Sequence, residues 1–272
     1  MSQAQALREI NDLNTPASIR RSIRDGSFIG QTAGMAPGYT QGNLAILPAK
    51  QAMDFMRYCQ RNPKPCPLVG VSDTGNPMLP TLGHDIDIRT DIPSYNVYQN
   101  GELTETVSDI KSLWQDDFVA FIIGCSFSFE QAMMDEGIKL RHMEENLTVS
   151  MYITSLETSP AGIFQGGTVV SMRPMTARNA IRAVEVTSRF PHTHGSPVHL
   201  GDPSAIGIKD INKPDWGDAQ PIADDEIPVF WACGVTPQNA IRIAKPELCI
   251  THTPGSMLIT DLPSQQDARL ED

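Results

Sequence analysis

The sequence predicts an α/β fold with mixed α+β features, arranged as two lobes. Short apolar runs of strand length alternate with segments of helical periodicity along most of the chain. Residues 169–203 and 229–263 are also similar when one is shifted by 60 positions, with 11 identical pairs in 35. About two identities would arise by chance at average composition. We therefore expect an internally duplicated βα unit in the C-terminal half.

The predicted lobes divide the 272-residue chain near its middle. We expect a mixed α/β lobe over residues 1–115 and an α/β lobe that contains the repeat over residues 116–272. An arrangement in which the two lobes interleave remains open. Because no low-complexity segment or linker separates them, we expect an extensive interface between them.

Composition and charge restrict the class of protein. The net charge of −11 argues against a nucleic acid or a membrane as partner, but local arginines can still bind a small acidic metabolite. The N-terminal residues lack the apolar core of a signal peptide, and the five cysteines form no CxxC pair. We therefore expect a cytoplasmic protein with reduced thiols, and a homo-oligomer remains open.

In the N-terminal half, capping and turn residues mark the predicted element boundaries. Thr15 before Pro16 is typical of a helix start, and Gly26 is typical of its end. Asn100-Gly101 between two alternating segments predicts a β-hairpin with a type I′ turn. The other predicted elements are strands over residues 43–47, 68–71 and 85–89, hairpin strands over 95–99 and 102–107, and a helix over 51–60.

In the C-terminal half, an apolar run over residues 118–124 predicts a buried strand. Each repeat copy then offers a strand, a helix and an apolar segment that leads into a His-Thr loop. Thr176 and Thr236 are predicted to cap the two helices, with Pro237 at the first helical position of the second. The remaining predicted elements are a helix over 129–136 and strands over 147–153, 168–172, 229–233 and 248–250.

Histidines supply the first candidate site. His192, His194 and His199 lie within eight residues, but only His192 has a histidine, His252, as its repeat partner. Histidine titrates nearest neutrality and suits proton transfer, and its ring nitrogens also bind metals. We predict that His192 and His252 are a catalytic proton-transfer pair and expect no metal. A three-histidine metal site and purely structural histidines remain the alternatives.

The strand-to-helix junction over residues 124–130 supplies the second candidate site. Ligands of open α/β sheets dock at such junctions, and the amides of a first helical turn favour a carboxylate. We predict that Cys125, Ser126 and Ser128 bind substrate and that Glu130 is catalytic as a general acid or base. A low-pKa thiolate at Cys125 is a further hypothesis, and a capping serine beside a first-turn carboxylate is the structural alternative.

The two repeat loops also carry Gly-Ser pairs, whose backbone amides can approach a bound anion closely. We expect both loops to face one cavity beside the Cys125 junction, although ordinary tight turns have the same composition. No P-loop, GxGxxG or HExxH motif is present, so we expect no cofactor. The predicted substrate-binding residues of the loops are Thr193, Gly195, Ser196, Thr253, Gly255 and Ser256.

Five long segments carry a family resemblance. They resemble the hydro-lyase family that includes D-glutamate cyclases. The resemblance covers nearly the whole chain and implies a two-part α/β fold with a water-eliminating activity. In the characterised branch of that family, D-glutamate closes to 5-oxo-D-proline. The segments are GYTQGNLAILP (38–48), DIPSYNVYQNGE (91–102), GCSFSFEQAM (124–133), FPHTHGSPVHLGDP (190–203) and ITHTPGSMLITD (250–261).

We therefore expect a lyase that removes water from a small acidic substrate, with D-glutamate as the candidate. Cyclisation requires that the amine lose a proton, that the leaving oxygen gain one, and that the tetrahedral oxyanion be stabilised. Two other functions remain open. One is a non-catalytic sensor of an acidic metabolite, and the other is a metal-assisted hydroxy-acid dehydratase that uses His192, His194 and His199.

Overall fold

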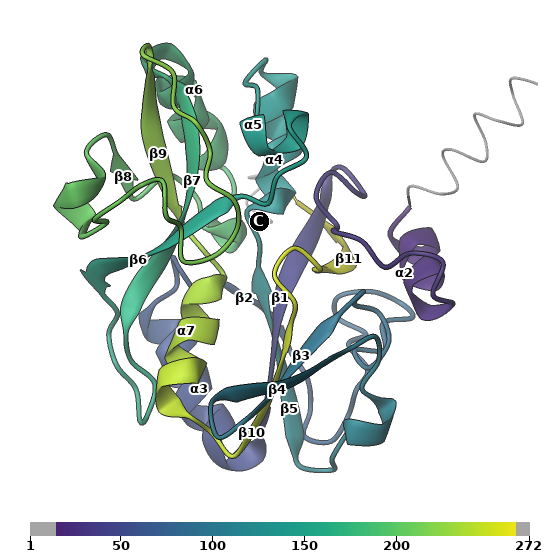
Figure 1. Cartoon of the computed structure of the whole chain (residues 1–272). Coiled ribbons are helices and arrows are strands. Elements are labelled where there is room, and N and C mark those ends of the chain that lie inside the picture. The colour runs from purple at the N-terminus through teal and green to yellow at the C-terminus, as the bar shows by residue number, and fades with distance from the viewer. Residues whose placement is uncertain (1–14, 265–272) are drawn as a thin grey trace, which may run out of the picture.

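Two antiparallel sheets and the helices packed on them form the protein (Figure 1). The computed structural model describes residues 15–264. The larger sheet has the strand order β2-β5-β1-β10-β3-β4, with β11 also paired to β1, and the smaller sheet has the order β6-β7-β9-β8. This arrangement confirms the predicted mixture of α and β structure.

The elements follow one another along the chain with these bounds. The strands are β1 Tyr39–Pro48, β2 Leu68–Val71, β3 Tyr95–Gln99, β4 Glu102–Val107, β5 Phe118–Gly124, β6 Ser150–Glu157, β7 Gly167–Thr176, β8 His199–Leu200, β9 Glu226–Ala232, β10 Leu248–His252 and β11 Leu258–Pro263. The helices are α2 Pro16–Arg24, α3 Ala49–Arg61, α4 Phe127–Asp135, α5 Arg141–Glu144, α6 Ala177–Thr187 and α7 Val235–Ala244.

Helices α3 and α7 cover one face of the larger sheet. Phe55 on α3 meets Phe121 on β5 edge-on, with ring centroids 4.9 Å apart, and α7 adds to the same buried cluster. The irregular segment 79–95 covers the other face with fully buried side chains such as Ile86 and Ile88. Because both faces of β5 are covered, that strand is continuously apolar rather than alternating.

Helices α4 and α6 cover one face of the smaller sheet. Trp231 on β9 packs against Phe129 on α4 at 5.9 Å between ring centroids. On the opposite face, Tyr152 and Phe230 form a second aromatic contact at 6.4 Å beneath an irregular segment that includes Ile206. Each sheet is therefore a layer between a helix pair and an irregular cover.

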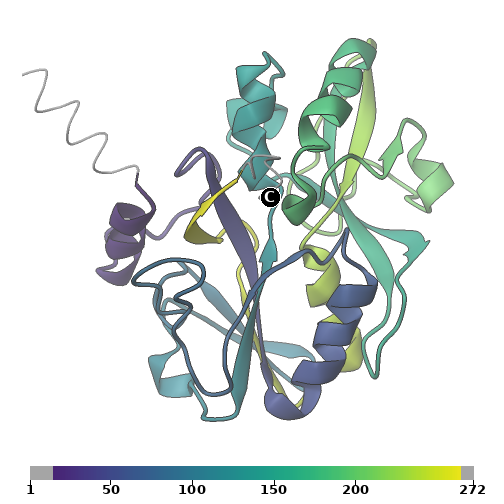
Figure 2. The same cartoon turned by 180° about the vertical axis from the view of Figure 1, so that it is seen from behind.

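Helices α4 and α7 exchange between the two sheets (Figures 1 and 2). Helix α4 follows β5 of the larger sheet but packs on the smaller sheet. Helix α7 follows β9 of the smaller sheet but packs on the larger one. The exchange brings the starts of both helices to the boundary between the sheets.

Four strands of the larger sheet have the same arrangement as the smaller sheet. The order β2-β5-β1-β10 corresponds to β8-β9-β7-β6, with antiparallel pairing throughout. Helices α3 and α6 follow the corresponding strands β1 and β7, and the exchanged helices α4 and α7 follow β5 and β9. By this correspondence Cys125 is equivalent to Cys233.

The predicted duplication of residues 169–203 at 229–263 is not confirmed. Both copies begin with a strand and a helix, but α6 leads into a 3-10 turn at Pro191–Thr193, whereas α7 leads into strand β10. Thr176 caps α6, as predicted. Thr236 does not cap α7, because that helix begins at Val235 and has Pro237 as its third residue. The aligned threonines therefore have different structural roles.

Local signals in the N-terminal half are mostly confirmed. Thr15 forms a capping box with Ser18 at the start of α2. Asn100 and Gly101 have φ angles of 52° and 82°, the positive values that a type I′ turn requires. The predicted strand over residues 85–89 is wrong, since this segment forms turns. Asp85 binds Arg20 of α2 at 2.6 Å and Asp87 binds Arg89 at 2.7 Å, so these side chains do not line a strand face.

Strands from both predicted lobe ranges share the larger sheet. β1 to β4 come from residues 1–115, and β5, β10 and β11 come from residues 116–272. The two ranges therefore interleave through this sheet. Within residues 15–264, no helix combines the length and apolar character needed to cross a membrane.

Candidate active site at two strand-to-helix junctions

β5 and β9 end at the boundary between the sheets in the same way. Cys125 follows β5 and donates its N–H to Gln41 O on β1 at 2.9 Å. Cys233 follows β9 and donates its N–H to Val169 O on β7 at 3.0 Å. Each helix starts two residues after its cysteine. The α4 junction comprises residues 124–130, and the α7 junction comprises residues 232–238.

A buried hydroxyl holds each helix start against the neighbouring strand. Ser128 Oγ accepts the Gln41 N–H at 2.9 Å, and Thr236 Oγ1 accepts the Val169 N–H at 2.9 Å. Thr236 also donates to Val169 O at 3.2 Å. Both hydroxyls therefore satisfy backbone groups that a further strand residue would otherwise bind. Ser128, predicted to bind substrate, has this structural contact.

Glycine permits close packing at both junctions. A Cβ atom on Gly124 would lie 1.8 Å from His192 O, and a Cβ atom on Gly234 would lie 2.0 Å from Asn43 Nδ2. The Asn43 amide in turn donates to Gly124 O at 3.1 Å. The two junctions and the loop that contains His192 are thus in direct contact around β1 and β5.

The junction cysteines are buried neutral thiols. Burial raises the pKa of Cys125 to about 12 and that of Cys233 to about 11. Hydrogen bonds from the first helical amides, those of Phe127 and Val235, oppose this shift without reversing it. The low-pKa thiolate considered for Cys125 is therefore wrong: burial outweighs the positive end of the helix.

At the α4 junction, Glu130 forms a buried ion pair with Arg173. Arg173 Nη2 and Nε donate to Glu130 Oε1 at 2.5 and 3.2 Å, and the guanidinium also donates to Ser126 Oγ and Ser171 Oγ at 3.1 Å. His142 Nε2 lies 3.1 Å from the same carboxylate oxygen. Burial raises the pKa of Glu130, but Arg173 and His142 outweigh it, so the pKa is lowered and the carboxylate stays ionised.

At the α7 junction, Gln238 occupies the position that corresponds to Glu130. Its Nε2 lies 3.0 Å from His252 Nδ1. The backbone N–H of Leu44 donates to the same ring nitrogen at 3.1 Å. Burial lowers the pKa of His252 to about 4, so the ring is neutral near pH 7. Because Nδ1 accepts a hydrogen bond, Nε2 carries the proton.

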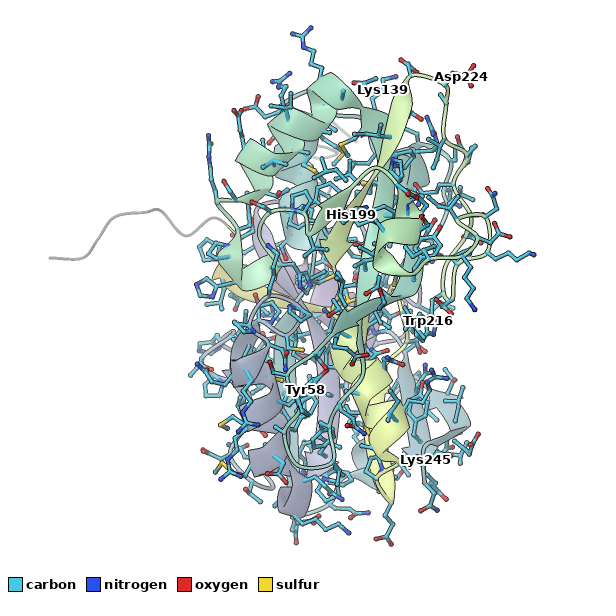
Figure 3. The ribbon with its side chains drawn as sticks, turned by 90° about the vertical axis from the view of Figure 1, so that its left-hand side faces the viewer. Tyr58, Lys139, His199, Trp216, Asp224 and Lys245 are labelled. Carbon is cyan, nitrogen blue, oxygen red and sulfur yellow. The ribbon has the colours of Figure 1, made fainter. Side chains whose placement is uncertain are left out.

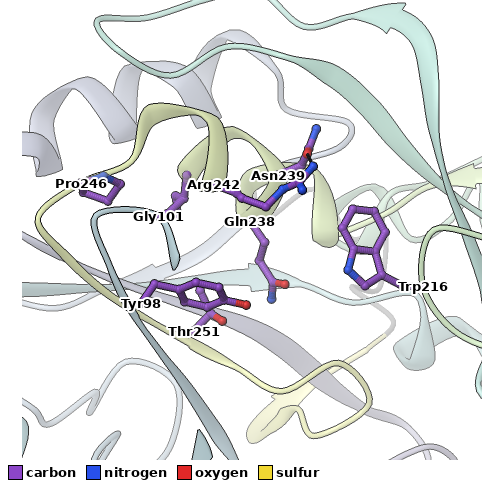
Figure 4. Close-up of a pocket in the computed structure, with 9 residues that line it drawn as sticks. Tyr98, Gly101, Trp216, Gln238, Asn239, Arg242, Pro246 and Thr251 are labelled. Carbon is purple, nitrogen blue, oxygen red and sulfur yellow. Dashed lines mark hydrogen bonds between the residues drawn. The ribbon is translucent and has the colours of Figure 1, made fainter. Parts of the chain in front are cut away.

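A cavity extends along α7 from the junction to the β3–β4 hairpin (Figure 4). It encloses about 430 Å³, part of it open to solvent. Figure 4 shows the Gln238 side chain directed into the space between Tyr98 and Trp216. In Figure 3, Trp216 lies near the N-terminal end of α7 and Lys245 at its C-terminal end. The lining residues are Tyr98, Gly101, Trp216, Gln238, Asn239, Ile241, Arg242, Pro246 and Thr251.

The α7 cavity combines a cation with neutral hydrogen-bonding groups. Arg242 lies one helical turn from Gln238 on the same face of α7, a spacing of about 6 Å. Burial raises the pKa of Tyr98, so its phenol remains a donor near neutrality. Thr251 adds a buried hydroxyl. A cation and several donors around one small hollow suit a carboxylate ligand.

The predicted proton-transfer histidines lie at different hollows. His192 is exposed and lines an open hollow beside Cys59 and Cys66. His252 is fully buried and contacts Gln238, which lines the α7 cavity, but His252 itself is not a lining residue. The structure therefore does not place the two imidazoles at one cavity wall.

The other two histidines of the predicted cluster contact backbone oxygens. His194 Nδ1 lies 2.9 Å from Lys64 O, and burial lowers the pKa of His194 to about 4. His199 Nε2 lies 2.7 Å from Asp202 O. In the part of the chain that the structure describes, no group of three or more His, Cys, Asp or Glu side chains is placed to hold a metal ion.

The His-Thr loop that follows α6 is a tight turn held by its own chain. Gly195 has a φ of 64°, in the left-handed region. Thr193 is buried, with its hydroxyl donating to Phe190 O at 3.4 Å. The Ser196 hydroxyl donates to Val184 O at 3.5 Å. These hydroxyls have a structural partner each.

The loop that follows β10 is also closed by internal hydrogen bonds. Thr253 Oγ1 donates to Asn96 Oδ1 at 3.1 Å, and Ser256 N donates to Thr253 O at 2.9 Å. Gly255 has a φ of 93°, and its carbonyl accepts the Thr32 N–H at 2.9 Å. This loop thereby anchors the segment that precedes β1.

Sequence reasoning did not identify several central residues. Arg173, His142 and Gln238 belong to no motif, and Cys233 was predicted only as the end of a strand. One signal could have found the second junction, namely the shared pattern Cys-x-x-Ser/Thr directly after an apolar strand at residues 125–128 and 233–236.

Comparisons with known proteins extend these observations. Residues 119–261, more than half of the chain, match the family described as D-glutamate cyclase. The "Putative hydro-lyase Bpet2233" of Bordetella petrii is 60% identical over 92% of this chain and 95% of its own length. A "Putative hydro-lyase" of Verminephrobacter eiseniae is 61% identical over 89% of both chains.

A solved structure was also matched. It is described as the nitrogen repressor-like protein MJ0159 from Methanococcus jannaschii, and it aligns with a TM-score of 0.38 at 10% sequence identity. The alignment covers 89% of this chain and 97% of that chain. A likeness at this level supports no argument about fold or function.

Proposed function

This chain belongs to the D-glutamate cyclase family, and from this premise we propose that it is a lyase that converts D-glutamate to 5-oxo-D-proline and water. In this reaction the amine nitrogen bonds to the γ-carboxyl carbon. The γ-carboxyl loses one oxygen, which leaves as water with two protons from the ammonium group. The match to the family and the hydro-lyase names of the relatives support this reaction class.

We place the substrate in the α7 cavity. The observation that carries this proposal is that Arg242 and Gln238, one helical turn apart on α7, line the same cavity as Tyr98 and Thr251. The Arg242 guanidinium also donates to Asn239 Oδ1 at 3.2 Å. Arg242 would bind the α-carboxylate, because a guanidinium forms strong charge-assisted hydrogen bonds with carboxylates. Gln238, Tyr98 and Thr251 would donate to the γ-carboxyl oxygens, where negative charge develops as the nitrogen attacks.

His252 would act as a positioning residue for Gln238. Its Nδ1 accepts the Leu44 N–H, so a role in proton transfer requires that this bond open first. The substrate-contacting and catalytic roles predicted for His192 and Glu130 stay predictions. Neither side chain is among the residues that line the α7 cavity.

The direct test is to incubate the purified protein with D-glutamate and to measure 5-oxoproline by mass spectrometry. L-Glutamate, incubated in parallel, reports on stereospecificity. We expect product from the D enantiomer. Saturable binding of D-glutamate in a thermal-shift titration, without any product, would instead support the sensor and overturn the proposed reaction.

The site is tested by Arg242→Gln, with Arg182→Gln as its matched control. Arg182 is the half-buried residue on α6 that aligns with Arg242 in the sequence repeat. It binds Glu136, and neither residue lines the cavity. Loss of a charge-assisted contact worth about 1.5–3 kcal/mol should lower kcat/KM by about 10- to 150-fold in Arg242→Gln. Equal activity in both variants would remove the α7 cavity from the proposal.

The roles of the two histidines are tested in the same way. His252→Asn should lower activity strongly, because Gln238 loses the partner that orients its amide, and His192→Asn should leave activity nearly unchanged. The reverse order of effects would restore the exposed imidazole as a catalytic group and move the site to the hollow beside Cys66.

A further inference from the structure

A small hollow lies between α4 and the loop over residues 34–39. From the helix it is lined by Glu130, Gln131 and Met134 among others. The equivalent positions on α7 are occupied by Gln238, Asn239 and Arg242, which line the α7 cavity. The α4 hollow is therefore the counterpart of the α7 cavity, but its chemistry is different because a carboxylate replaces the amide.

One oxygen of that carboxylate has no donor. Arg173 and His142 both contact Glu130 Oε1. Glu130 Oε2 is buried and has no hydrogen-bond partner among residues 15–264. The side chain is only 1% exposed and lines the hollow. An ionised oxygen that is buried without a donor is costly, so a ligand there would be strongly favoured.

A second unpartnered acceptor belongs to Gln41, whose side-chain amide binds a residue that lines the hollow. Gln41 Nε2 donates to Thr32 O at 2.9 Å and to Met35 O at 3.1 Å, and Met35 lines the hollow. Gln41 Oε1 is buried and has no hydrogen-bond partner within the described chain. Both unpartnered atoms are acceptors, so a ligand that satisfies them must be a donor or a cation.

We propose that the α4 hollow binds one monovalent cation of the size of a water molecule, potassium or ammonium, with Glu130 Oε2 as its charged ligand. The hollow has room for about one sphere of that size. A divalent cation would carry twice the charge of the one carboxylate, Glu130, that lines the hollow, so a single charge matches the site better. Arg173 is occupied on the opposite oxygen of Glu130, and the nearby thiols are neutral.

The direct test is a crystal of the wild-type protein grown in rubidium chloride, because rubidium replaces potassium and ammonium and scatters anomalously. We expect an anomalous peak within coordination distance of Glu130 Oε2. A peak of water density that is the same in rubidium, sodium and choline chloride, without anomalous signal, would overturn the proposal in favour of a buried water molecule.

Solution measurements separate the cation from ionic strength. The Tm should rise saturably in potassium or ammonium chloride, and choline chloride at equal ionic strength should not reproduce this rise. The Tm curves of the two salts then tell which cation binds more tightly. Equal shifts in all salts, choline included, would contradict a specific site.

Two variants complete the test. Glu130→Gln should abolish the cation-dependent shift, but it leaves Arg173 unpaired and can unfold the chain. Met134→Phe keeps the ion pair and fills the hollow, so it should also abolish the shift in a folded protein. Met56→Phe, at an exposed position on α3, is the matched control and should keep the shift. A full shift in Met134→Phe would place the cation elsewhere and refute this site.

Discussion

The α4 and α7 junctions have the same backbone and opposite chemistry. In each, a cysteine follows a buried strand, a hydroxyl holds the helix start, and the fourth helical residue contacts a histidine. That fourth residue is Glu130 in one junction and Gln238 in the other. Glu130 forms a buried ion pair with Arg173, whereas Gln238 lines the cavity along α7.

The difference originates on the neighbouring strand. Arg173 on β7 corresponds to Ala45 on β1, since each lies four residues after the strand residue that binds the junction cysteine. The positive charge of Arg173 compensates the negative charge of the buried carboxylate at position 130. With Ala45 at the equivalent position, a carboxylate in place of Gln238 would have no cation on the neighbouring strand, and Arg242 lies a full helical turn away on α7, so a neutral amide fits. The residue on the strand and the residue on the helix are therefore matched at each junction, Arg173 with Glu130 at one and Ala45 with Gln238 at the other.

The largest effect should come from breaking the ion pair. Arg173→Met leaves Glu130 as an uncompensated buried charge and should reduce the free energy of unfolding by about 3–5 kcal/mol. Gln238→Met at the other junction removes only neutral contacts and should cost about 1 kcal/mol. Urea denaturation of both variants measures the difference.

A double variant checks that the loss comes from the charge. Adding Glu130→Met to Arg173→Met removes the unpaired carboxylate, so part of the lost stability should return. If the double variant is less stable than Arg173→Met alone, the guanidinium acts mainly through packing on Phe129 and Trp231, which lie beneath it.

The next effect concerns the glycines of the two junctions. Gly124→Ala would place a Cβ atom against a backbone carbonyl of the His192 loop, which cannot rotate away. Gly234→Ala would place it against the Asn43 side chain, which has more freedom to move. We expect Gly124→Ala to cost about 1–3 kcal/mol and Gly234→Ala to cost less, measured by thermal unfolding. Equal costs would mean that the Asn43 amide is as rigid as the backbone.

Much of the fold follows from local sequence signals. The Thr15 cap, the Asn100-Gly101 turn and the apolar run of β5 each determine an element through interactions between neighbouring residues. The segment 85–89 shows the limit. Its alternation correctly separates buried isoleucines from acidic residues, but Arg20 and Arg24 of α2 bind Asp85 from more than 60 positions away. Within residues 15–264 the segment forms one isolated bridge, between Asp87 and Met78, rather than a strand.

The candidate site was harder to predict, because its residues meet only through the helix exchange. The similarity between residues 169–203 and 229–263 aligned Thr176 with Thr236, although one caps a helix and the other binds a neighbouring strand. The correspondence that the fold reveals joins Cys125 to Cys233, with few identities around it. Glu130 was identified from its place in a first helical turn, whereas Arg173 lies in the middle of a strand without any motif.

Stability should also depend on pH. The pKa of His252 is about 4 in the folded chain and about 6.5 when unfolded, and the same holds for His194. Between these values the unfolded chain binds protons that the folded chain does not. Stability is therefore complete above pH 6.5 and falls as the pH decreases towards 4, by about 1.4 kcal/mol per pH unit for each histidine.

The variant His194→Asn isolates one of these contributions. Asparagine tolerates the positive φ of 84° at this position, so the backbone should be retained. The slope of unfolding free energy against pH between 4 and 6.5 should drop by about 1.4 kcal/mol per unit. An unchanged slope would show that the ring of His194 titrates normally in the folded chain.

The smallest effect should come from making the α7 junction resemble the α4 junction. Gln238→Glu places a carboxylate beside the His252 ring, where it favours the protonated imidazole. Because position 238 is half-buried and Ala45 offers no cation, the new charge should cost about 1 kcal/mol of stability at pH 7. At the same time the pKa of His252 should rise from about 4 towards its ordinary value, as followed by the ring proton shifts in an NMR titration. Gln238→Met, which has a similar length and no charge, is the control and should leave the titration of His252 near its original position. If His252 titrates alike in the Gln238→Glu and Gln238→Met variants, the side chain at position 238 does not contact the ring in solution. The two junctions would then be equivalent in their backbone only.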